Sequence, residues 1–362
     1  MIPIAKPEIT DEEIDAVVKV LQSGNIASGK RVIEFEEKFA KYIGVKHAVA
    51  CSNGTAALHA TLLAHGVGVG DEVIVPSFSF IATATAVSMC GARPIFADVH
   101  PTLYGIDIDD VKHKITARTK AVIGVHLYGL PCYAVTLRKL CDDYDIALIE
   151  DSAQAVGASI GDSRCGSIGN SGCFSFYATK NLTTGEGGMV TTNSDQIADS
   201  VRMIINHGQK IKYIHEGLGY NYRMTDIVAA IGVNQLKRID KLNNLRRLIA
   251  LIYGSDIEVD GTFILPYEPS NMYHVYHQYV IQLSNAFPMR RDLFIKYLTS
   301  NGVGSAVHYP IPIHKQPLYN IPISLKVSEN LAKNVISIPI HPSMSVEDVS
   351  NVVDVINAVV RK

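Results

Sequence analysis

The sequence at residues 171–192 reads SGCFSFYATKNLTTGEGGMVTT and contains two short apolar runs separated by a polar loop. The runs at 171–177 and 187–192 have the length and the aromatic or β-branched content typical of buried strands. Between them stands a single lysine, Lys180, at the start of a loop too rich in threonine and glycine for a regular element. We therefore expect Lys180 to be held at a strand end, over a cavity.

Working outward from this segment, five further apolar runs alternate with helical stretches. They lie at residues 48–51, 71–76, 93–99, 120–127 and 146–151. Several are apolar on both faces, which favours a largely parallel sheet with helices on each side. The sequence thus predicts an α/β domain with a mostly parallel seven-stranded sheet over the first two thirds of the chain.

Two helices are predicted before the sheet. Thr10 and Glu13 form a capping box at the start of the first helix, and Gly24 ends it. Ile14, Val17, Val18 and Leu21 share one face of that helix. A second helix is expected over 32–42.

A second unit is predicted after the sheet. A long amphipathic stretch begins near residue 225 and connects the two parts. Beyond it we expect a strand near 277–284, a helix near 288–302, a strand leading to 306–310 and a closing helix over 346–360. We assign 1–240 to a large domain and 241–362 to a smaller α+β C-terminal domain.

The composition excludes several classes of protein. The chain has 362 residues, of which 47% are hydrophobic and 19% charged, with a formal net charge of −2. These values exclude a disordered, collagenous or highly basic chain. The near-neutral net charge gives no sign of a nucleic-acid or anionic-membrane partner. The first 15 residues lack the pattern of a secretion signal, and no apolar run reaches the length of a bilayer span. We expect a soluble, cytoplasmic protein.

Cysteine and histidine spacing gives no sign of a metal or a disulfide framework. The six cysteines include no C-x-x-C pair, and the 13 histidines include no H-E-x-x-H motif. We therefore predict no metal site.

Lys180 by itself has two interpretations. A lone loop lysine is ordinarily a solvated charge. A desolvated lysine is instead neutral and nucleophilic, and it can form an imine with a carbonyl cofactor.

The segment at 146–158, IALIEDSAQAVGA, provides a second candidate. Its apolar strand ends in Glu150 and Asp151, and Asp151 could simply cap the next helix. A carboxylate beside a pyridinium nitrogen would instead keep that nitrogen protonated, which is the protein's contribution to pyridoxal 5′-phosphate (PLP) chemistry. Gln154 could then donate to the ring oxygen.

A third segment, AVACSNGTAALHATLLA at 48–64, breaks at residues 52–55 before a helix. Free N–H groups at a helix start, together with a hydroxyl, can cradle a phosphate, although an ordinary capped helix fits the same residues. Phe78 and Phe80 follow the next strand, so either ring could stack on a flat cofactor or pack in the core.

These segments resemble the sugar aminotransferases of the DegT/StrS type, a branch of the fold type I PLP enzymes. The resemblance is collinear and nearly full length. It rests on SGNIASGKRVIEFEEKFAKYIGV, SNGTAAL, DEVIVPSFSF, EDSAQAVGA, SFYATKNLTTGEGG, GLGYNYRMTDIVAA and AVHYPIPIHKQPLY. It implies a fold type I PLP-transferase with a large PLP-binding domain and a smaller C-terminal domain.

The resemblance also implies the roles of individual residues. Lys180 would form the internal aldimine with PLP and shuttle the proton, and Asp151 would hold the pyridinium. The remaining cofactor contacts it implies are Gln154 on the ring hydroxyl, Phe80 on the ring face, and Gly54, Thr55, Ser175 and Asn221 on the phosphate. Asn221 would reach across from a second subunit, because the family is dimeric with shared active sites. Substrate would meet Arg223, His308, Tyr309 and His314.

The implied activity is transfer of an amino group from L-glutamate to a keto group of a nucleotide-linked sugar. The chemistry releases 2-oxoglutarate and cycles PLP through pyridoxamine 5′-phosphate. Family members that dehydrate the sugar instead carry histidine at the lysine position, so Lys180 favours amination. The candidates for diphosphate contacts are Lys30, Arg31, Arg223 and Lys315.

The most common acceptor in this family is a 4-keto-6-deoxy sugar. The alternatives are amination at C3 of a 3-keto sugar or uronic acid, and a non-catalytic PLP-fold regulatory protein. A nicotinamide oxidoreductase is disfavoured, because Gly66, Gly68 and Gly70 precede a strand, whereas a dinucleotide loop follows one and opens a helix.

Overall fold

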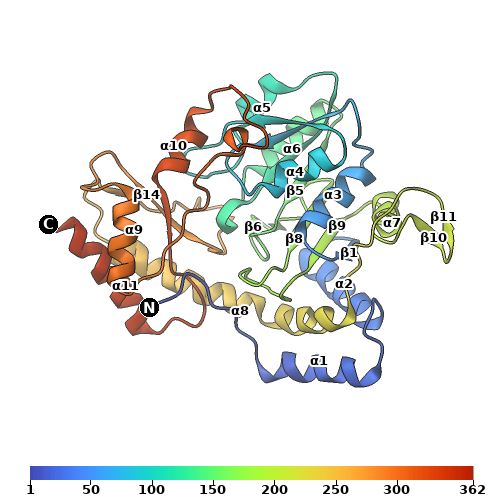
Figure 1. Ribbon diagram of the computed structural model, residues 1–362, viewed down its shortest axis with the longest axis horizontal. Coiled ribbons are helices and arrows are strands. Elements are labelled where there is room, and N and C mark those ends of the chain that lie inside the picture. Colours follow the sequence, from blue (N-terminus) through green and yellow to red (C-terminus); the bar gives the residue numbers. More distant parts are fainter. Residues whose placement is uncertain (362) are drawn as a thin grey trace.

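The large part of the molecule is built on the predicted seven-stranded sheet, as the computed structural model of residues 1–361 shows (Figure 1). The strand order is β1-β9-β8-β5-β4-β2-β3. The bounds are β1 His47–Cys51, β2 Glu72–Pro76, β3 Arg93–Ala97, β4 Thr119–Val125, β5 Ala147–Asp151, β8 Ser171–Ser175 and β9 Gly188–Thr192. Each strand corresponds to one of the seven apolar runs, so the predicted α/β class is confirmed.

Strand direction gathers the candidate segments at one edge of the sheet. All pairs from β3 to β8 are parallel, and β9 alone runs antiparallel to its neighbours β8 and β1. The carboxyl ends of six strands therefore lie on the same side. Ligands of open α/β sheets bind outside these ends.

Helices cover both faces of the sheet. Their bounds are α2 Lys30–Ile43, α3 Gly54–Ala64, α4 Ala82–Met89, α5 Ile108–Lys114, α6 Ala134–Asp143 and α7 Asp195–Ile204. Along β2, Val73 and Val75 pack with α3 and α4, whereas Ile74 packs with α5 and α6. This alternation explains why the strand is apolar at every position, as expected for a parallel sheet buried on both faces.

The C-terminal unit begins along α8, Asp226–Asp256, a helix of 31 residues. A three-stranded antiparallel sheet, β12-β14-β15, forms its centre. The bounds are β12 Phe263–Ile264, β14 Tyr279–Leu283, β15 Val335–Ile338, α9 Arg291–Ser300, α10 Lys326–Asn334 and α11 Val346–Val360. The predicted strand near 306–310 was wrong, since only an isolated bridge joins Ala306 to Ser337. The sequence did not reveal α10 or β15.

The boundary at residue 240 stays a prediction. The helix α8 continues through this position, and it contributes Ile239 to the core beneath the large sheet and Tyr253 to the core of the C-terminal unit. The remaining short elements were not predicted. They are β6 Ser159–Ile160, β7 Ser163–Arg164, β10 Gln209–Ile211, β11 Ile214–His215, β13 Met272–Tyr273 and the 3₁₀ turns Leu127–Gly129 and Ile313–Lys315.

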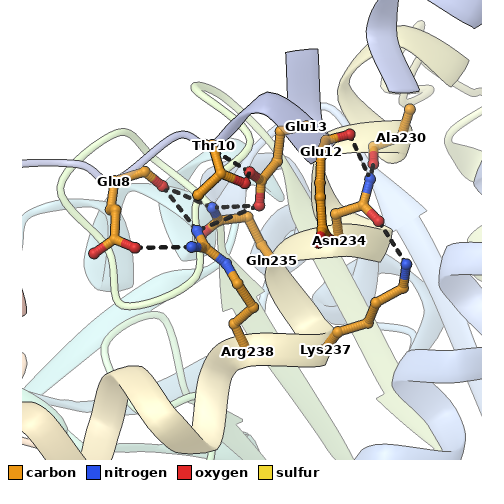
Figure 2. Close-up of polar contacts among 9 residues, drawn as sticks. All are labelled: Glu8, Thr10, Glu12, Glu13, Ala230, Asn234, Gln235, Lys237 and Arg238. Atoms are coloured by element: carbon orange, nitrogen blue, oxygen red, sulfur yellow. Dashed lines mark hydrogen bonds and ion pairs between the residues drawn. The ribbon is translucent and has the colours of Figure 1, made fainter. Parts of the chain in front are cut away.

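The first helix, α1 Asp11–Ser23, packs on α8 through polar side chains (Figure 2). The predicted capping box between Thr10 and Glu13 is present. Gln235 Nε2 donates to Glu13 Oε1 at 3.1 Å, and Arg238 Nη2 lies 3.3 Å from the same oxygen. The apolar side chains Ile14, Val18 and Leu21 are exposed instead. The partner face on α8 therefore decides which side of α1 is buried.

Among residues 1–361, no helix is both long and apolar enough to cross a membrane.

Candidate active site

A cavity of about 660 Å³ lies at the carboxyl edge of the large sheet. Its walls come from segments that are far apart in the sequence: the start of α3, the loops after β2 and β8, the end of β5, and residues 277–278 and 308–309. The predicted site residues that line it are Gly54, Thr55, Phe80, Asp151, Gln154, Ser175, Lys180, His308 and Tyr309. The structure thus brings nine of the twelve candidates together.

Lys180 is held in place by the loop that follows β8. The N–H of Phe176 donates to Gly187 O at 2.8 Å, and the N–H of Thr184 donates to Phe176 O at 2.9 Å, so the loop is closed at its base. The N–H of Lys180 itself donates to Tyr177 O. Burial lowers the pKa of the Lys180 amine to about 8, although nearby Asp151 acts in the opposite direction. A partly buried lysine whose amine is withdrawn from water can be neutral and nucleophilic.

Asp151 ends β5 and is 6% exposed. Its Oδ2 accepts a hydrogen bond from Thr83 Oγ1 at 2.8 Å, and its Oδ1 accepts one from the N–H of Ala153 at 3.2 Å. Burial raises the pKa of this carboxyl despite these donors and Lys180. A desolvated carboxylate is a strong acceptor for a protonated ring nitrogen.

A buried cluster of His126 and Glu150 holds the backbone at the end of β5, next to Asp151. The N–H of His126 donates to Asp151 O at 3.1 Å, and His126 Nε2 lies 2.9 Å from Glu150 Oε2. Glu150 also accepts hydrogen bonds from the N–H groups of Gly166, Ile168 and Gly169. Because its oxygens are saturated by these donors, Glu150 acts as an anchor for the end of β5. Sequence analysis missed both His126 and Thr83, whose contacts depend on the packing of distant segments.

The start of α3 presents donors to the cavity. Asn53 caps the helix, with Oδ1 accepting from the N–H of Ala56 at 2.8 Å. The N–H groups of Gly54 and Thr55 therefore stay without an acceptor among residues 1–361. A side chain at Gly54 would bring its Cβ within 2.8 Å of Ser175 Cβ. Glycine thus lets the helix start approach the end of β8, where backbone N–H groups and the Ser175 hydroxyl could hold a phosphate.

Gln154, Tyr309 and Phe80 form one wall. Gln154 Oε1 accepts from the N–H of Tyr128 at 2.7 Å, and its Nε2 lies 3.2 Å from the Tyr309 hydroxyl. The Phe80 ring centroid is 5.8 Å from that of Tyr309, and the Phe80 side chain is half exposed. This exposure leaves an aromatic face free for a flat ligand.

Two histidines complete the lining near Lys180. Burial and the Lys180 amine lower the pKa of His308 to about 4, and burial lowers the pKa of His277 well below its usual value. Both rings are therefore neutral near pH 7. Sequence analysis predicted His308 but not His277, which stands two residues before β14 and carries no motif signal of its own.

Three predicted residues lie away from the cavity of their own chain. His314 is fully buried and bonded to Ser77 Oγ and Glu329 Oε1. Arg223 Nη1 donates to Asn206 Oδ1 at 2.8 Å, and Asn221 is exposed. Their predicted contacts with cofactor or substrate stay predictions.

The diphosphate candidates also lie elsewhere. Lys30 and Arg31 line a separate groove between α1 and α2, and Lys315 Nζ donates to Ile323 O.

The sheet topology, with a lysine and a carboxylate in one cavity, matches that of the fold type I aminotransferases. Residues 7–357 match the model of the DegT/DnrJ/EryC1/StrS aminotransferase family, and the chain belongs to this family. It is 40% identical to the GDP-perosamine synthase of Vibrio cholerae, over 88% of this chain and 87% of that protein. It is 39% identical to the dTDP-3-amino-3,6-dideoxy-alpha-D-galactopyranose transaminase of Aneurinibacillus thermoaerophilus, over 94% and 93%.

A solved structure agrees with these relatives. DesV of S. venezuelae, determined in complex with a ketimine intermediate, superposes with a TM-score of 0.93 at 35% identity, covering 97% of this chain and 95% of that one. The protein is therefore a sugar aminotransferase that acts on nucleotide sugars, as the sequence resemblance predicted.

Proposed function

We propose that this enzyme uses PLP to move an amino group from L-glutamate to the C4 keto group of a nucleotide-linked 4-keto-6-deoxy sugar. The observation that carries the proposal is the pairing of Lys180 with Asp151 in one cavity, with burial acting on both groups. The residues present fit the cofactor at three places: an amine for its carbonyl, a carboxylate for its ring nitrogen and free helix N–H groups for its phosphate.

When bound, PLP supplies a carbonyl that takes up the amino group and a ring that accepts electrons. Lys180 Nζ would take the proton from the α-carbon of glutamate and later deliver a proton to C4 of the sugar. With a pKa of about 8, about a tenth of the lysine is neutral at pH 7. Asp151 would keep the ring nitrogen protonated, held in position by Thr83.

The phosphate would be held by the N–H groups of Gly54 and Thr55 and by the Ser175 hydroxyl. Phe80 would cover the ring, and Gln154 would bond its oxygen after exchanging its Tyr309 partner. His308 and Tyr309 would contact the substrate. The predicted roles of Arg223 and His314 belong to this proposal, although neither lines the cavity within one chain.

A second copy of the chain would complete the site. Asn221 is exposed and follows the β10–β11 hairpin, whose neighbourhood exposes the large side chains Ile211, Tyr213, Ile214 and Leu218. This hairpin projects from the edge of the molecule beside α7 (Figure 1). We propose a homodimer in which Asn221 reaches the phosphate of the partner's cofactor, in the cytoplasm.

Amination at C3 is the second candidate. The Aneurinibacillus relative is named for a 3-amino sugar and is nearly as similar as the Vibrio relative named for perosamine, a 4-amino sugar. A direct comparison of 4-keto and 3-keto nucleotide sugars would distinguish the two.

The test is the absorption spectrum of the purified protein with PLP, before and after addition of L-glutamate. The proposal requires a visible band from cofactor bound through Lys180, and its replacement by the pyridoxamine form. A panel of nucleotide-linked 4-keto and 3-keto sugars then identifies the acceptor by return of the visible band. A protein that binds no PLP, or whose bound PLP does not respond to glutamate, would contradict the proposal.

A further inference from the structure

A second, much smaller cavity lies beside the Lys180 loop. Its volume is about 20 Å³, and its lining includes Lys6, Glu8, Lys180, Gln235, Arg246 and Pro342. A cavity of this size holds about one particle the size of a water molecule. It lies between the N-terminal segment, the loop after β8 and the middle of α8, and Lys180 lines both this cavity and the larger one.

Arg246 brings a buried positive charge to this cavity. Its side chain is 4% exposed, and Nη1 donates to Ile340 O at 2.6 Å. Nε has no hydrogen-bond partner in the described part of the chain, and no carboxylate of residues 1–361 forms an ion pair with the guanidinium. Burial lowers the pKa of Arg246 to about 10. A buried charge without a counter-ion is costly, so this arrangement calls for an anion.

The acidic groups nearest the cavity are already paired (Figure 2). Glu8 Oε1 accepts from Arg238 Nη1 at 2.8 Å, and Glu13 is bonded by Arg238 and Gln235. The Glu8 carbonyl accepts from Gln235 Nε2 at 2.9 Å and from Arg238 Nη2 at 3.1 Å. Because Arg238 neutralises these acids, neither compensates the charge of Arg246.

The surroundings of Arg246 add donors and positive charge. His341 is 2% exposed, and neither ring nitrogen has a partner among residues 1–361. Burial lowers the pKa of His341, and the charges of Arg246 and Lys6 lower it further, while the Pro3 backbone and the more weakly acting Asp348 carboxylate oppose them. Lys6 and Arg246 both line the cavity and bring positive charge to it, whereas the neutral His341 lies outside its lining.

We propose that this cavity binds a single monoatomic anion, chloride in the cell, as the counter-ion of Arg246. A carboxylate or a phosphate has several non-hydrogen atoms and is too large for the space, whereas a halide is a single particle, as a water molecule is. A water molecule fits as well but does not neutralise the guanidinium. The site goes beyond the proposed transamination, which requires no halide, and it would fasten the N-terminal segment to the loop that carries Lys180.

The direct test is a bromide soak of crystals of the PLP-loaded wild-type enzyme, with data collected at the bromine absorption edge. The expected result is an anomalous peak in the cavity between Arg246 and Lys6. A cavity that is filled by water, or that shows no anomalous peak at saturating bromide, overturns the proposal. This measurement needs no variant and is independent of the sugar substrate.

A second test is the melting temperature of the holoenzyme as chloride replaces gluconate at constant ionic strength. A site that binds chloride only in the folded state raises Tm by about 1–3 °C near ten times its Kd. Arg246→Met should abolish this rise. The matched control is Arg247→Met, on the same helix, which loses the ion pair with Glu268 but removes no group from the cavity and should keep the chloride response. Equal chloride responses in the wild type and Arg246→Met would overturn the assignment.

Discussion

Lys180 and Asp151 enter one cavity from the loop after β8 and from the end of β5, and burial acts on their pKa values in opposite directions. It lowers that of the lysine to about 8 and raises that of the carboxyl. Each group partly compensates the other, because Asp151 favours the charged amine and Lys180 favours the charged carboxylate. Burial therefore keeps a fraction of the amine neutral at neutral pH, and Asp151 limits that fraction.

This coupling predicts a pH dependence for cofactor attachment. The rate at which the apoenzyme bonds PLP through Lys180 should rise with pH and level off above a midpoint of about 8, since only the neutral amine attacks a carbonyl. Asp151→Asn removes the negative charge that supports the ammonium form, so the midpoint should fall below 8. Stopped-flow absorbance of the visible band measures both. A wild-type midpoint near the ordinary lysine value of about 10.4 would show that the amine is not desolvated.

Removal of the Lys180 amine should abolish turnover but should still allow PLP to bind in the cavity. Lys180→Ala is expected to lower kcat by about 10³-fold or more, because proton transfer alone contributes about 10²- to 10⁴-fold and the covalent attachment is lost as well. PLP should still bind through its phosphate and ring contacts, which equilibrium dialysis can measure. Lys180→Arg is the control that retains a positive charge but forms no bond to the carbonyl. Ordinary turnover by either variant would remove Lys180 from the reaction.

The sheet and the positions of Asp151, Ser175 and Lys180 at its edge can be predicted from the sequence for a physical reason. Strands buried on both faces are apolar throughout, and parallel strands bring their carboxyl ends together, so Asp151 and Ser175 must lie near the loop of Lys180. Side chains that reach the site through packing, such as Thr83 and His277, have no such periodic signal.

Periodicity also could not predict the orientation of α1. It identifies an apolar face with Ile14 and Leu21, but the side of α1 that is buried carries Glu13, bonded by the polar residues of α8, together with Val20. The partner of an element, and not its own pattern alone, decides which face turns inward.

Because α3 lies close to β8 at Gly54, we predict that Gly54→Ala lowers both stability and PLP binding. The added Cβ would lie 2.8 Å from Ser175 Cβ, so the helix start or the serine must shift. We expect a loss of about 1–3 kcal/mol of stability and weaker PLP binding, because the shift disturbs the phosphate contacts. Gly68→Ala is the matched control, since nothing lies within 4 Å of its Cβ position and its φ is not left-handed. Melting temperature and PLP titration measure the two effects, and equal behaviour of both variants would contradict the predicted cradle.

Thr83 should act as a positioning residue for Asp151. Thr83→Val keeps the shape but removes the hydroxyl that donates to Oδ2 at 2.8 Å, so the pKa of the carboxyl should rise further. The expected result is a fall in kcat/KM of about 10-fold to 100-fold, with a change in the pH dependence of the cofactor spectrum. Thr83→Ser restores the hydroxyl and should recover most of the activity. Failure of serine to rescue would indicate a packing role for the methyl group instead.

The exposed hairpin next to Asn221 predicts where the second subunit binds. Tyr213 and Leu218 are 79% and 82% exposed, and both lie in the segment that leads to Asn221. The double substitution Tyr213→Asp and Leu218→Asp places two charges in the proposed interface, which should shift the protein toward monomer in light scattering and lower activity at dilute concentration. Val346→Asp is the control, because Val346 is 78% exposed on α11, at the opposite end of the molecule (Figure 1). If the double variant stays dimeric and fully active, the interface lies elsewhere and Asn221 does not complete the partner's phosphate site from this hairpin.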